Sequence, residues 1–265
     1  MTEQQRLFEE CRQVAEEAAL AGGQVLLDHR YAPLEIEHKD RQEVVTNVDR
    51  LSDEAICAVL RRAFPRHAIV SEESGAQESA SPYRWIVDPL DGTEAYIRGL
   101  HFSAVTIALT RENEMVLGVV YHPFQDEMYT ALADGPTTVN DYPVEVTSEA
   151  DLAQARLILD YSPRDELRQR LNDLEWNRGI KQMMRFGGSL ALNMCQVAKG
   201  AADGYIYGRM RNRVKSWDMA AATLLVQRAG GYVLDRQGQP LNALEPQGFV
   251  LCSNAKLALE RLCGD

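Results

Sequence analysis

The sequence lacks a long uncharged hydrophobic run of the kind that a membrane-spanning helix needs. Its first residues are polar and lead into a charged amphipathic stretch, which is not the pattern of a secretory signal. Cysteine is scarce, and none of the five forms a Cys-x-x-Cys pair, so a thiolate metal site or redox pair is not expected. We therefore expect a cytoplasmic protein without a membrane partner, whose cysteines are small buried side chains.

Positive charge is also in short supply. Lys and Arg together number 28 against 39 Asp and Glu, which gives a formal net charge of −11. Such a balance argues against a surface that binds nucleic acid or anionic lipid. An acidic protein that takes an anionic substrate needs a local source of positive charge. Bound cations are the obvious candidate.

Apolar periodicity in the first part of the chain predicts two long helices. The first thirty residues carry apolar side chains at spacings of three and four, and residues 35–43 are typical of a strand or hairpin. Thr46-Asn47 offers an N-cap for the second helix. The apolar face that we predict for that helix consists of Val48, Leu51, Ala55, Val59 and Ala63.

The rest of the chain predicts a layered α/β fold. Strands are expected at 67–71, 84–88, 103–110, 115–121 and 127–132, with a turn-rich stretch at 134–141. Further strands are expected near 156–160, 180–186, 203–207, 232–235 and 249–252, alternating with helices at 163–174, 189–199, 217–229 and the C-terminus. We expect an α+β half (1–147) and an α/β half (148–265) that share one core.

The segment from Asp88 to Thr93, Asp-Pro-Leu-Asp-Gly-Thr, carries the strongest chemical signal. An apolar strand runs into Asp88, the proline breaks it, and Asp91-Gly92-Thr93 follows in a turn. Two carboxylates three residues apart at a strand end can bridge a pair of hard cations. Gly92 lets a ligand approach the backbone closely, and the N–H groups after it can hold a phosphate. Taken alone, the segment is also compatible with an Asx-turn that merely ends a strand.

Three other acidic motifs are ordinary when each is taken alone. Glu72 and Glu73 follow an apolar strand, where solvated acids are common, and at most one of them faces a given site. Asp49 lies in the first turn of a helix, where an acid complements the helix dipole. Asp218 begins another apolar helix and is typical of a cap.

In their order along the chain, the four motifs resemble the inositol monophosphatase family, especially its bacterial members. The matching segments are Thr46-x-x-Asp49, Glu72-Glu73-Ser74-Gly75, Asp88 to Thr93, and Trp217-Asp218 followed by Ala220-Ala221. The likeness extends from the N-terminal helix to the last strand and helix. It implies a layered αβαβα sugar-phosphatase fold, a lithium-sensitive phosphomonoesterase and a homodimer.

The resemblance also assigns roles to individual residues. It implies that Glu72, Asp88 and the carbonyl of Leu90 bind a first Mg²⁺, and that Asp88, Asp91 and Asp218 bind a second. Glu72 would also contact a weaker third ion. Asp49 and Thr93 would activate the attacking water, and the N–H groups of Gly92 and Thr93 would hold the phosphate. The segment Gly188-Ser189-Leu190, with Asp91, would meet the hydroxyls of the leaving alcohol.

Elementary chemistry agrees with this assignment. Crowded carboxylates repel one another unless bound cations compensate them. Oxygen ligands suit hard ions such as Mg²⁺, and two such ions can activate water and stabilise a departing alkoxide. No covalent phosphoenzyme is expected. The haloacid-dehalogenase phosphatases are set aside because their two aspartates are two residues apart, whereas Asp88 and Asp91 are three apart.

The substrate is less well defined by the sequence than the reaction. We expect a small phosphorylated metabolite, with inositol monophosphate first. Two departures from the family pattern weaken that choice: Tyr207 stands where the family usually has a sugar-binding Glu, and Glu94-Ala95-Tyr96 replaces a Thr-Asn-Phe-like triplet. The cationic segment Arg209 to Lys215 could bind a second phosphate group of a substrate. A 3′(2′),5′-bisphosphate nucleotidase or a fructose-1,6-bisphosphatase-like enzyme is therefore the first alternative. A non-catalytic member that binds a ligand or partner is the second alternative.

Overall fold

The computed structural model describes residues 2–38, 44–161, 172–173, 176–177, 179–208, 214–246, 248–257 and 259. Its helices are α1 (Glu3–His29), α2 (Asn47–Ala63), α3 (Thr93–Ile97), α5 (Leu190–Ala198) and α6 (Ser216–Arg228), with a 3-10 turn at Leu152–Gln154. The strands of its first part are β1 (Ile36–His38), β2 (Val44–Thr46), β3 (Ala68–Ser71), β4 (Gly75–Gln77), β5 (Tyr83–Asp91), β6 (Ala104–Arg111), β7 (Glu114–His122), β8 (Glu127–Leu132), β9 (Thr138–Val139) and β10 (Tyr142–Pro143). Those of its second part are β11 (Arg156–Tyr161), β12 (Gln182–Met184), β13 (Gly204–Gly208), β14 (Gly231–Leu234) and β15 (Val250–Asn254).

The larger sheet has eight strands in the order β10-β9-β8-β7-β6-β5-β3-β4. Its strands pair antiparallel, apart from β3 and β5, which are parallel. The long central strands β5, β6 and β7 consist almost entirely of buried residues, because helices cover both faces of the sheet. The parallel pair brings the ends of β3 and β5 to the same edge, which is where the candidate site lies.

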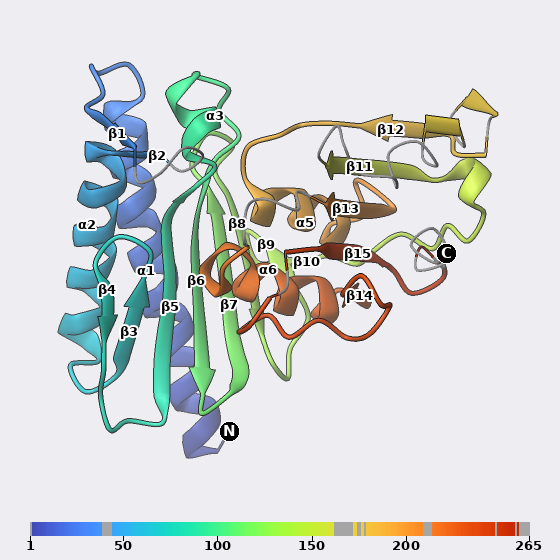
Figure 1. Ribbon diagram of the computed structural model, residues 1–265. Coiled ribbons are helices and arrows are strands. Elements are labelled where there is room, and N and C mark those ends of the chain that lie inside the picture. The colour runs from blue at the N-terminus through green and yellow to red at the C-terminus, as the bar shows by residue number, and fades with distance from the viewer. Residues whose placement is uncertain are drawn as a thin grey trace.

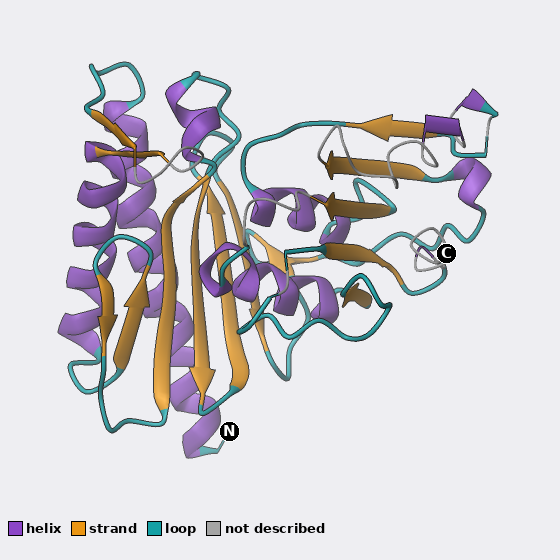
Figure 2. Cartoon of the chain, viewed as in Figure 1, coloured by secondary structure: helices purple, strands orange, loops and turns teal. Residues whose placement is uncertain are grey.

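The smaller sheet has five strands in the order β12-β11-β13-β15-β14. β11 pairs parallel with both β12 and β13, whereas β15 pairs antiparallel with its two neighbours. Figures 1 and 2 show the layers from left to right: α1 with α2, the larger sheet, α5 with α6, and the smaller sheet. The expected layered fold is therefore confirmed in the described residues. Of the helix expected at 163–174 only residues 172–173 are described, and they are helical, while most of the expected C-terminal helix lies outside the described residues.

One hydrophobic core joins the two sheets. Its residues come from the larger sheet, from α5 and α6, and from the smaller sheet; Ala108, Met194, Leu225 and Tyr205 represent these four sources. A second core fills the space between the larger sheet and the α1/α2 layer, and Ile56, Trp85 and Leu117 belong to it. The division of the chain at residue 147 into two halves that share one core stays a prediction.

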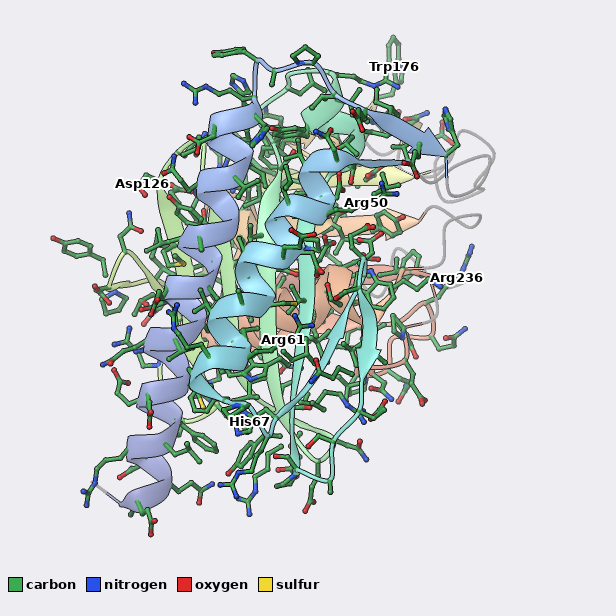
Figure 3. All side chains as sticks on the ribbon, turned by 90° about the vertical axis from the view of Figure 1, so that its left-hand side faces the viewer. Arg50, Arg61, His67, Asp126, Trp176 and Arg236 are labelled. Atoms are coloured by element: carbon green, nitrogen blue, oxygen red, sulfur yellow. The ribbon has the colours of Figure 1, made fainter. Side chains whose placement is uncertain are left out.

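The predicted apolar face of α2 is correct only in part: Val48 and Val59 are buried, but other members of that face are not. Leu51 is 39% exposed, and the face that packs inward includes three polar side chains, Asp49, Ser52 and Asp53, ahead of Ile56 and Leu60. The helix is therefore rotated from the apolar pattern, because the buried polar groups find hydrogen-bond partners in β3, β5 and α3. Figure 3 views this layer face on, with Arg50 and Arg61 marking the two ends of α2.

Some local elements were not predicted. The turn-rich stretch contains the short hairpin β9–β10, and β4 extends the sheet beyond β3. Of the strand or hairpin expected at residues 35–43, the structure describes the strand β1, which pairs antiparallel with β2 just after that range, while residues 39–43 lie outside the described residues. Four cysteines, Cys11, Cys57, Cys195 and Cys252, are buried free thiols, as expected, while Cys263 lies outside the described residues. Among the described helices, none is long and apolar enough to cross a membrane.

Candidate metal centre

The first two acids of the site are placed by the parallel pairing of β3 and β5. Ser71 and Val87 are register partners, and the backbone N–H of Glu72 donates to the carbonyl of Val87 at 3.1 Å. Glu72 therefore follows the end of β3 directly beside Asp88 on β5. Because parallel strands end at the same edge of a sheet, two segments that are separate in sequence deliver adjacent carboxylates.

The third acid is delivered by α6. Thr106 on β6 is the register partner of Asp88, and its Oγ1 donates to the carbonyl oxygen of Trp217 at 2.8 Å. This bond fixes the first turn of α6 over the strand end. One carboxylate oxygen of Asp218 accepts a hydrogen bond from the backbone N–H of Lys215 at 2.7 Å, which caps the helix. Asp218 is thus both a helix cap and a neighbour of Asp88.

Glu72, Asp88 and Asp218 form a compact carboxylate group. One carboxylate oxygen from each lies within 4.8 Å of the others. Asp88 is 2% exposed. Burial raises the pKa of Asp88 well above its usual range, and the negative charges of Glu72 and of two nearby aspartates raise it further. The ionised form of this group therefore needs a compensating cation.

Asp91, the last residue of β5, places its carboxylate at the start of α5. Its Oδ2 accepts hydrogen bonds from Ser189 Oγ at 2.5 Å and from the N–H of Ala191 at 2.8 Å, and its Oδ1 accepts from the N–H of Leu190 at 3.2 Å. Burial raises the pKa of Asp91 to about 6, against the lowering effect of these hydrogen bonds. The structure thus joins Asp91 to Ser189 and Leu190 and sets it beside Asp88 of the carboxylate group.

Only glycine fits at position 92. Gly92 has φ of +94°, and a Cβ atom built there would lie 2.7 Å from the backbone N of Ser189 and 3.0 Å from the carbonyl O of Phe102. The left-handed conformation disfavours any other L-residue, and the neighbouring atoms belong to the backbone, so they cannot rotate away. Gly92 therefore allows the turn after Asp91 to pack against the start of α5.

We expect Gly92→Ala to lower both thermal stability and activity strongly. The conformational cost is about 1–2 kcal/mol, and the contact with Ser189 adds to it by displacing the α5 start. Gly99→Ala is the matched control, since Gly99 has φ of +67° with no atom within 4 Å of a Cβ. Melting temperatures and phosphate-release rates of both variants check this. Equal behaviour of the two would show that close packing at Gly92 is unimportant.

Asp49 and Thr93 are hydrogen-bonded across the site. Thr93 Oγ1 lies 3.0 Å from Asp49 Oδ1 and 3.1 Å from the carbonyl oxygen of Leu90, so its proton has two acceptors. Asp49 Oδ2 accepts from the N–H and the hydroxyl of Thr46 at 2.8 and 2.6 Å. Burial raises the pKa of Asp49, and these hydrogen bonds oppose that effect. The pair thus provides a hydroxyl and a fixed carboxylate next to the carboxylate group.

These residues surround a cavity of about 250 Å³. The site residues predicted from the sequence that line this cavity are Glu72, Asp88, Leu90, Asp91, Gly92, Thr93, Gly188, Leu190 and Asp218. The other described lining residues are Val44, Glu94, Asp160, Tyr207, Val214, Lys215 and Trp217.

The remaining residues of the predicted motifs do not line the cavity directly. Glu73 is not among the described lining residues, which agrees with one inward glutamate of the pair. Asp49 and Ser189 reach the site through Thr93 and Asp91. Residues 209–213 of the cationic segment lie outside the described residues, whereas Lys215 lines the cavity.

Sequence reasoning did not identify four residues behind the site: Thr106, Ser52, Asp53 and Ser71. Their hydroxyl and carboxylate groups hold the elements that carry the acids. One signal was available for Ser52 and Asp53. They follow Asp49 by three and four residues, which places polar groups on the same helix face as a candidate site residue.

The carboxylate group fits a hard divalent cation. All of its donors are oxygen atoms, which Mg²⁺, Ca²⁺ and Mn²⁺ prefer over the nitrogen and sulfur ligands typical of zinc sites. The raised pKa of Asp88 points the same way, because a cation would remove the electrostatic cost of ionising this buried carboxyl. The arrangement can therefore bind metal and, through it, an anionic group in the cavity.

Known proteins resemble this chain over most of its length. The family model described as "Inositol monophosphatase family" matches residues 8–265. The chain is 36% identical over 230 residues to the Nus factor SuhB of Pasteurella multocida, covering 85% of each. It is 36% identical over 235 residues to the fructose-1,6-bisphosphatase/inositol-1-monophosphatase of Aquifex aeolicus, covering 86% of each. The crystal structure of the extragenic suppressor protein suhB from Bartonella henselae superposes with a TM-score of 0.84 at 30% identity, covering 96% of this chain and 98% of that one. The chain therefore belongs to the inositol monophosphatase family, whose members are phosphoric monoester hydrolases.

Proposed function

We propose that this protein is a Mg²⁺-dependent phosphomonoesterase that hydrolyses an inositol monophosphate. The observation that carries the proposal is the group of Glu72, Asp88 and Asp218, whose oxygens lie within 4.8 Å of one another at the wall of a cavity. Family membership supports the reaction class. The cavity is of a size for a small phosphorylated metabolite, and its acidic wall needs cations before a phosphate can approach.

Two or three Mg²⁺ ions are proposed for the site. Glu72, Asp88 and the Leu90 carbonyl would hold the first, and Asp88, Asp91 and Asp218 the second, with Glu72 also reaching a third. Bound Mg²⁺ supplies Lewis acidity, which lowers the pKa of water and offsets charge on the phosphate and the departing oxygen. The carboxylates of the chain set the position of this charge, because each is fixed by a strand end or a helix start.

The proton chemistry is assigned to Asp49 and Thr93. Thr93 Oγ1 would orient the attacking water by accepting its hydrogen bond while donating its own proton to Asp49 Oδ1, 3.0 Å away. Asp49 is held by two hydrogen bonds from Thr46, so its second oxygen stays directed at Thr93. The N–H groups of Gly92 and Thr93 are proposed to hold the phosphate, since both residues line the cavity.

The leaving alcohol is proposed to lie against Asp91 and the Gly188-Ser189-Leu190 segment. Asp91 accepts hydrogen bonds from Ser189 and Leu190 of this segment and a third from the adjacent Ala191, which fixes the wall that hydroxyl groups would meet. The test is a phosphate-release assay over a panel of metabolite monophosphates in the presence of Mg²⁺. Inositol 1-phosphate is expected to lead the panel. If the folded protein at saturating Mg²⁺ hydrolyses no compound of the panel, the proposed function is excluded.

A bisphosphate is the second candidate substrate, and one observation favours it. Lys215 lines the cavity, so a second anionic group would meet positive charge there. Tyr207, also in the wall, is buried and cannot accept hydrogen bonds as a carboxylate would. The relative from Aquifex aeolicus carries fructose-1,6-bisphosphatase in its name. 3′-Phosphoadenosine 5′-phosphate and fructose 1,6-bisphosphate therefore belong on the panel.

Lys215→Met separates the two candidates. If Lys215 holds a second phosphate, the variant should raise KM for the bisphosphate several-fold and leave KM for inositol 1-phosphate unchanged, because only the bisphosphate has a group for the ammonium. Lys181→Met is the control, since it removes the same charge from an exposed lysine that is not among the described lining residues. An equal effect of Lys215→Met on both substrates would exclude the bisphosphate reading.

A non-catalytic binding role is less well supported than turnover, because such a member should have lost an acid of the site, and Glu72, Asp88, Asp91 and Asp218 are all present. The homodimer and the cytoplasmic location expected from the resemblance and the composition stay predictions. Light scattering on the purified protein measures the oligomeric state directly.

A further inference from the structure

Two consecutive side chains of α2, Ser52 and Asp53, are buried behind the candidate metal centre. Ser52 is 0% exposed and Asp53 is 4% exposed, and neither is among the described residues that line the cavity. They share a helix face with Asp49, which they follow by three and four residues. A buried carboxylate and a buried hydroxyl at this place have to be stabilised by specific partners.

Ser52 is hydrogen-bonded to the Pro89–Leu90 peptide unit. Its hydroxyl donates to the carbonyl oxygen of Pro89 at 2.9 Å, while the N–H of the same peptide unit, from Leu90, donates to Asp88 Oδ1 at 3.0 Å. The pairing of β5 with β6 is irregular between Asp88 and Asp91, so this peptide is not held by regular sheet hydrogen bonds. One peptide plane thus links Ser52 to the carboxylate of Asp88.

Asp53 is linked to the other strand end. Its Oδ1 accepts a hydrogen bond from the hydroxyl of Ser71, the residue before Glu72, and a weaker one from Cys57 Sγ at 3.6 Å. Burial raises the pKa of the Cys57 thiol to about 11, so this thiol is a donor at neutral pH. Ser71 is 1% exposed, and its backbone pairs with β5 at Val87. The Asp53–Ser71 bond therefore joins α2 to the last residue of β3.

A glycine on α1 allows α1 to pack closely against this part of α2. Gly22 on α1 faces α2 so closely that a Cβ atom would lie 2.8 Å from Ser52 Oγ and 2.6 Å from Ile56 Cδ1. The close contact keeps α2 against the sheet, where both polar side chains reach their partners. The two side chains bridge from one helix turn to two different strand ends.

We propose that Ser52 and Asp53 are positioning residues of the metal centre: Ser52 orients Asp88 through the Pro89–Leu90 peptide, and Asp53 orients Glu72 through Ser71. The inference rests on the proposed function, in which Asp88 and Glu72 bind Mg²⁺. Residues that hold metal ligands in place from behind commonly change metal affinity by about 10-fold to 100-fold when they are replaced. Neither residue touches substrate.

The test measures Mg²⁺ binding by isothermal titration calorimetry, without substrate, and adds the Mg²⁺ dependence of phosphate release. Asp53→Ala and Ser71→Ala are each expected to weaken Mg²⁺ binding by about 10-fold or more. If Asp53 acts through Ser71, the double variant should bind Mg²⁺ no more weakly than Asp53→Ala alone. Asp53→Asn should restore most of the affinity, because an amide oxygen can still accept the Ser71 hydroxyl hydrogen bond.

Asp203→Ala is the matched control. Asp203 is 3% exposed and accepts hydrogen bonds from Thr147 Oγ1 at 2.5 Å and from the N–H of Arg156 at 2.7 Å, but it directly precedes β13 of the smaller sheet and does not line the described cavity. The control should lower the melting temperature and leave Mg²⁺ affinity unchanged. Ser71→Ala removes only a hydroxyl, so it provides a folded variant even if Asp53→Ala does not fold.

Three results would overturn the inference. Mg²⁺ affinity equal to wild type in Ser71→Ala and Ser52→Ala would show that these groups only stabilise the fold. Additive losses in the double variant would show that Asp53 does not act through Ser71. If the wild-type protein does not bind Mg²⁺, the proposed metal centre itself is overturned. This outcome differs from equal Mg²⁺ binding by the wild type and the variants, which would overturn only the positioning role of Ser52 and Asp53.

Discussion

Asp88→Asn is expected to lower the rate of phosphate release by about three orders of magnitude, because the site loses its central metal ligand. Several kcal/mol of transition-state stabilisation depend on correctly placed metal charge, and about 1.4 kcal/mol corresponds to a tenfold change in rate. Asp218→Asn should have a similar effect, since Asp218 belongs to the same carboxylate group. Steady-state kinetics at saturating Mg²⁺, with each variant's circular dichroism, make the measurement.

The same substitution should not destabilise the metal-free protein. Asp88 is 2% exposed, and burial together with the charge of Glu72 raises the pKa of its carboxyl. A neutral amide of the same shape avoids that cost, so the metal-free melting temperature should equal or exceed that of wild type. An active Asp88→Asn variant would contradict the mechanism, and an unfolded one would contradict this account of the site's electrostatics.

Glu73→Gln is the control for Asp88→Asn and Glu72→Gln. Glu73 is next to Glu72 in sequence but is not among the described lining residues of the cavity. We expect Glu73→Gln to retain most of the activity and Glu72→Gln to lose it. Equal losses in two folded variants would mean that the inward glutamate is assigned wrongly.

Removal of divalent metal is expected to abolish hydrolysis. It should also make the stability of the folded protein fall as pH rises, which is the reverse of the usual behaviour of aspartates. Asp91 has a folded-state pKa of about 6, above the ordinary value for an aspartate, and the pKa of Asp88 is raised as well. In the metal-free protein, the folded state therefore holds these protons more tightly than the unfolded chain. Stability from these groups is greatest at low pH and falls as pH rises.

The direction of this pH dependence, and the pH range over which it acts, follow from the difference in proton binding between the folded and unfolded states. Below about pH 4, Asp91 is protonated in both states and contributes nothing to the pH dependence. Between about pH 4 and pH 6, the unfolded chain releases this proton first, so unfolding becomes easier. Well above pH 6, the free-energy cost of ionising Asp91 in the folded protein is constant and on the order of 3 kcal/mol. Mg²⁺ replaces the protons, so it should stabilise the protein more at pH 7.5 than at pH 5.

Differential scanning fluorimetry at several pH values, with EDTA or with Mg²⁺, checks this prediction. The melting-temperature increase on adding Mg²⁺ should grow from pH 5 to pH 7.5 and should shrink in Asp88→Asn, which serves as the control for nonspecific salt effects. Lithium should inhibit the Mg²⁺-supported reaction, as the family resemblance implies. Full activity after exhaustive chelation, or an Mg²⁺ shift independent of pH, would contradict the metal centre.

The sequence was sufficient for the chemistry of the site because its motifs are local. Asp88 to Thr93 combines two acids, a proline and a glycine in six residues, and the positive φ of Gly92 follows from that turn. The apolar periodicity of α1 and α6 likewise predicted helices, because an amphipathic or buried helix records its environment residue by residue. Family membership followed from the order of the acidic motifs.

The orientation of α2 could not be read in the same way. Its apolar residues suggested a face containing Leu51, whereas the structure buries Ser52 and Asp53. Periodicity treats a polar residue as exposed, and it has no information on a hydrogen-bond partner 18 or 37 residues away, such as Ser71 or Pro89. The cost of burying these groups is offset only when the sheet is in place.

The sequence by itself determined which residues carry the acids, the hydroxyl and the glycine turn, and therefore the class of reaction. Only the tertiary structure decided which of these groups meet. The parallel register of β3 and β5 places Glu72 beside Asp88, and the bond from Thr106 to the Trp217 carbonyl brings Asp218 to the same point from 130 residues along the chain. The physical reason is that residue types and their spacing set local conformation, whereas distances between remote segments are set by strand pairing and by the packing of helices on the sheet.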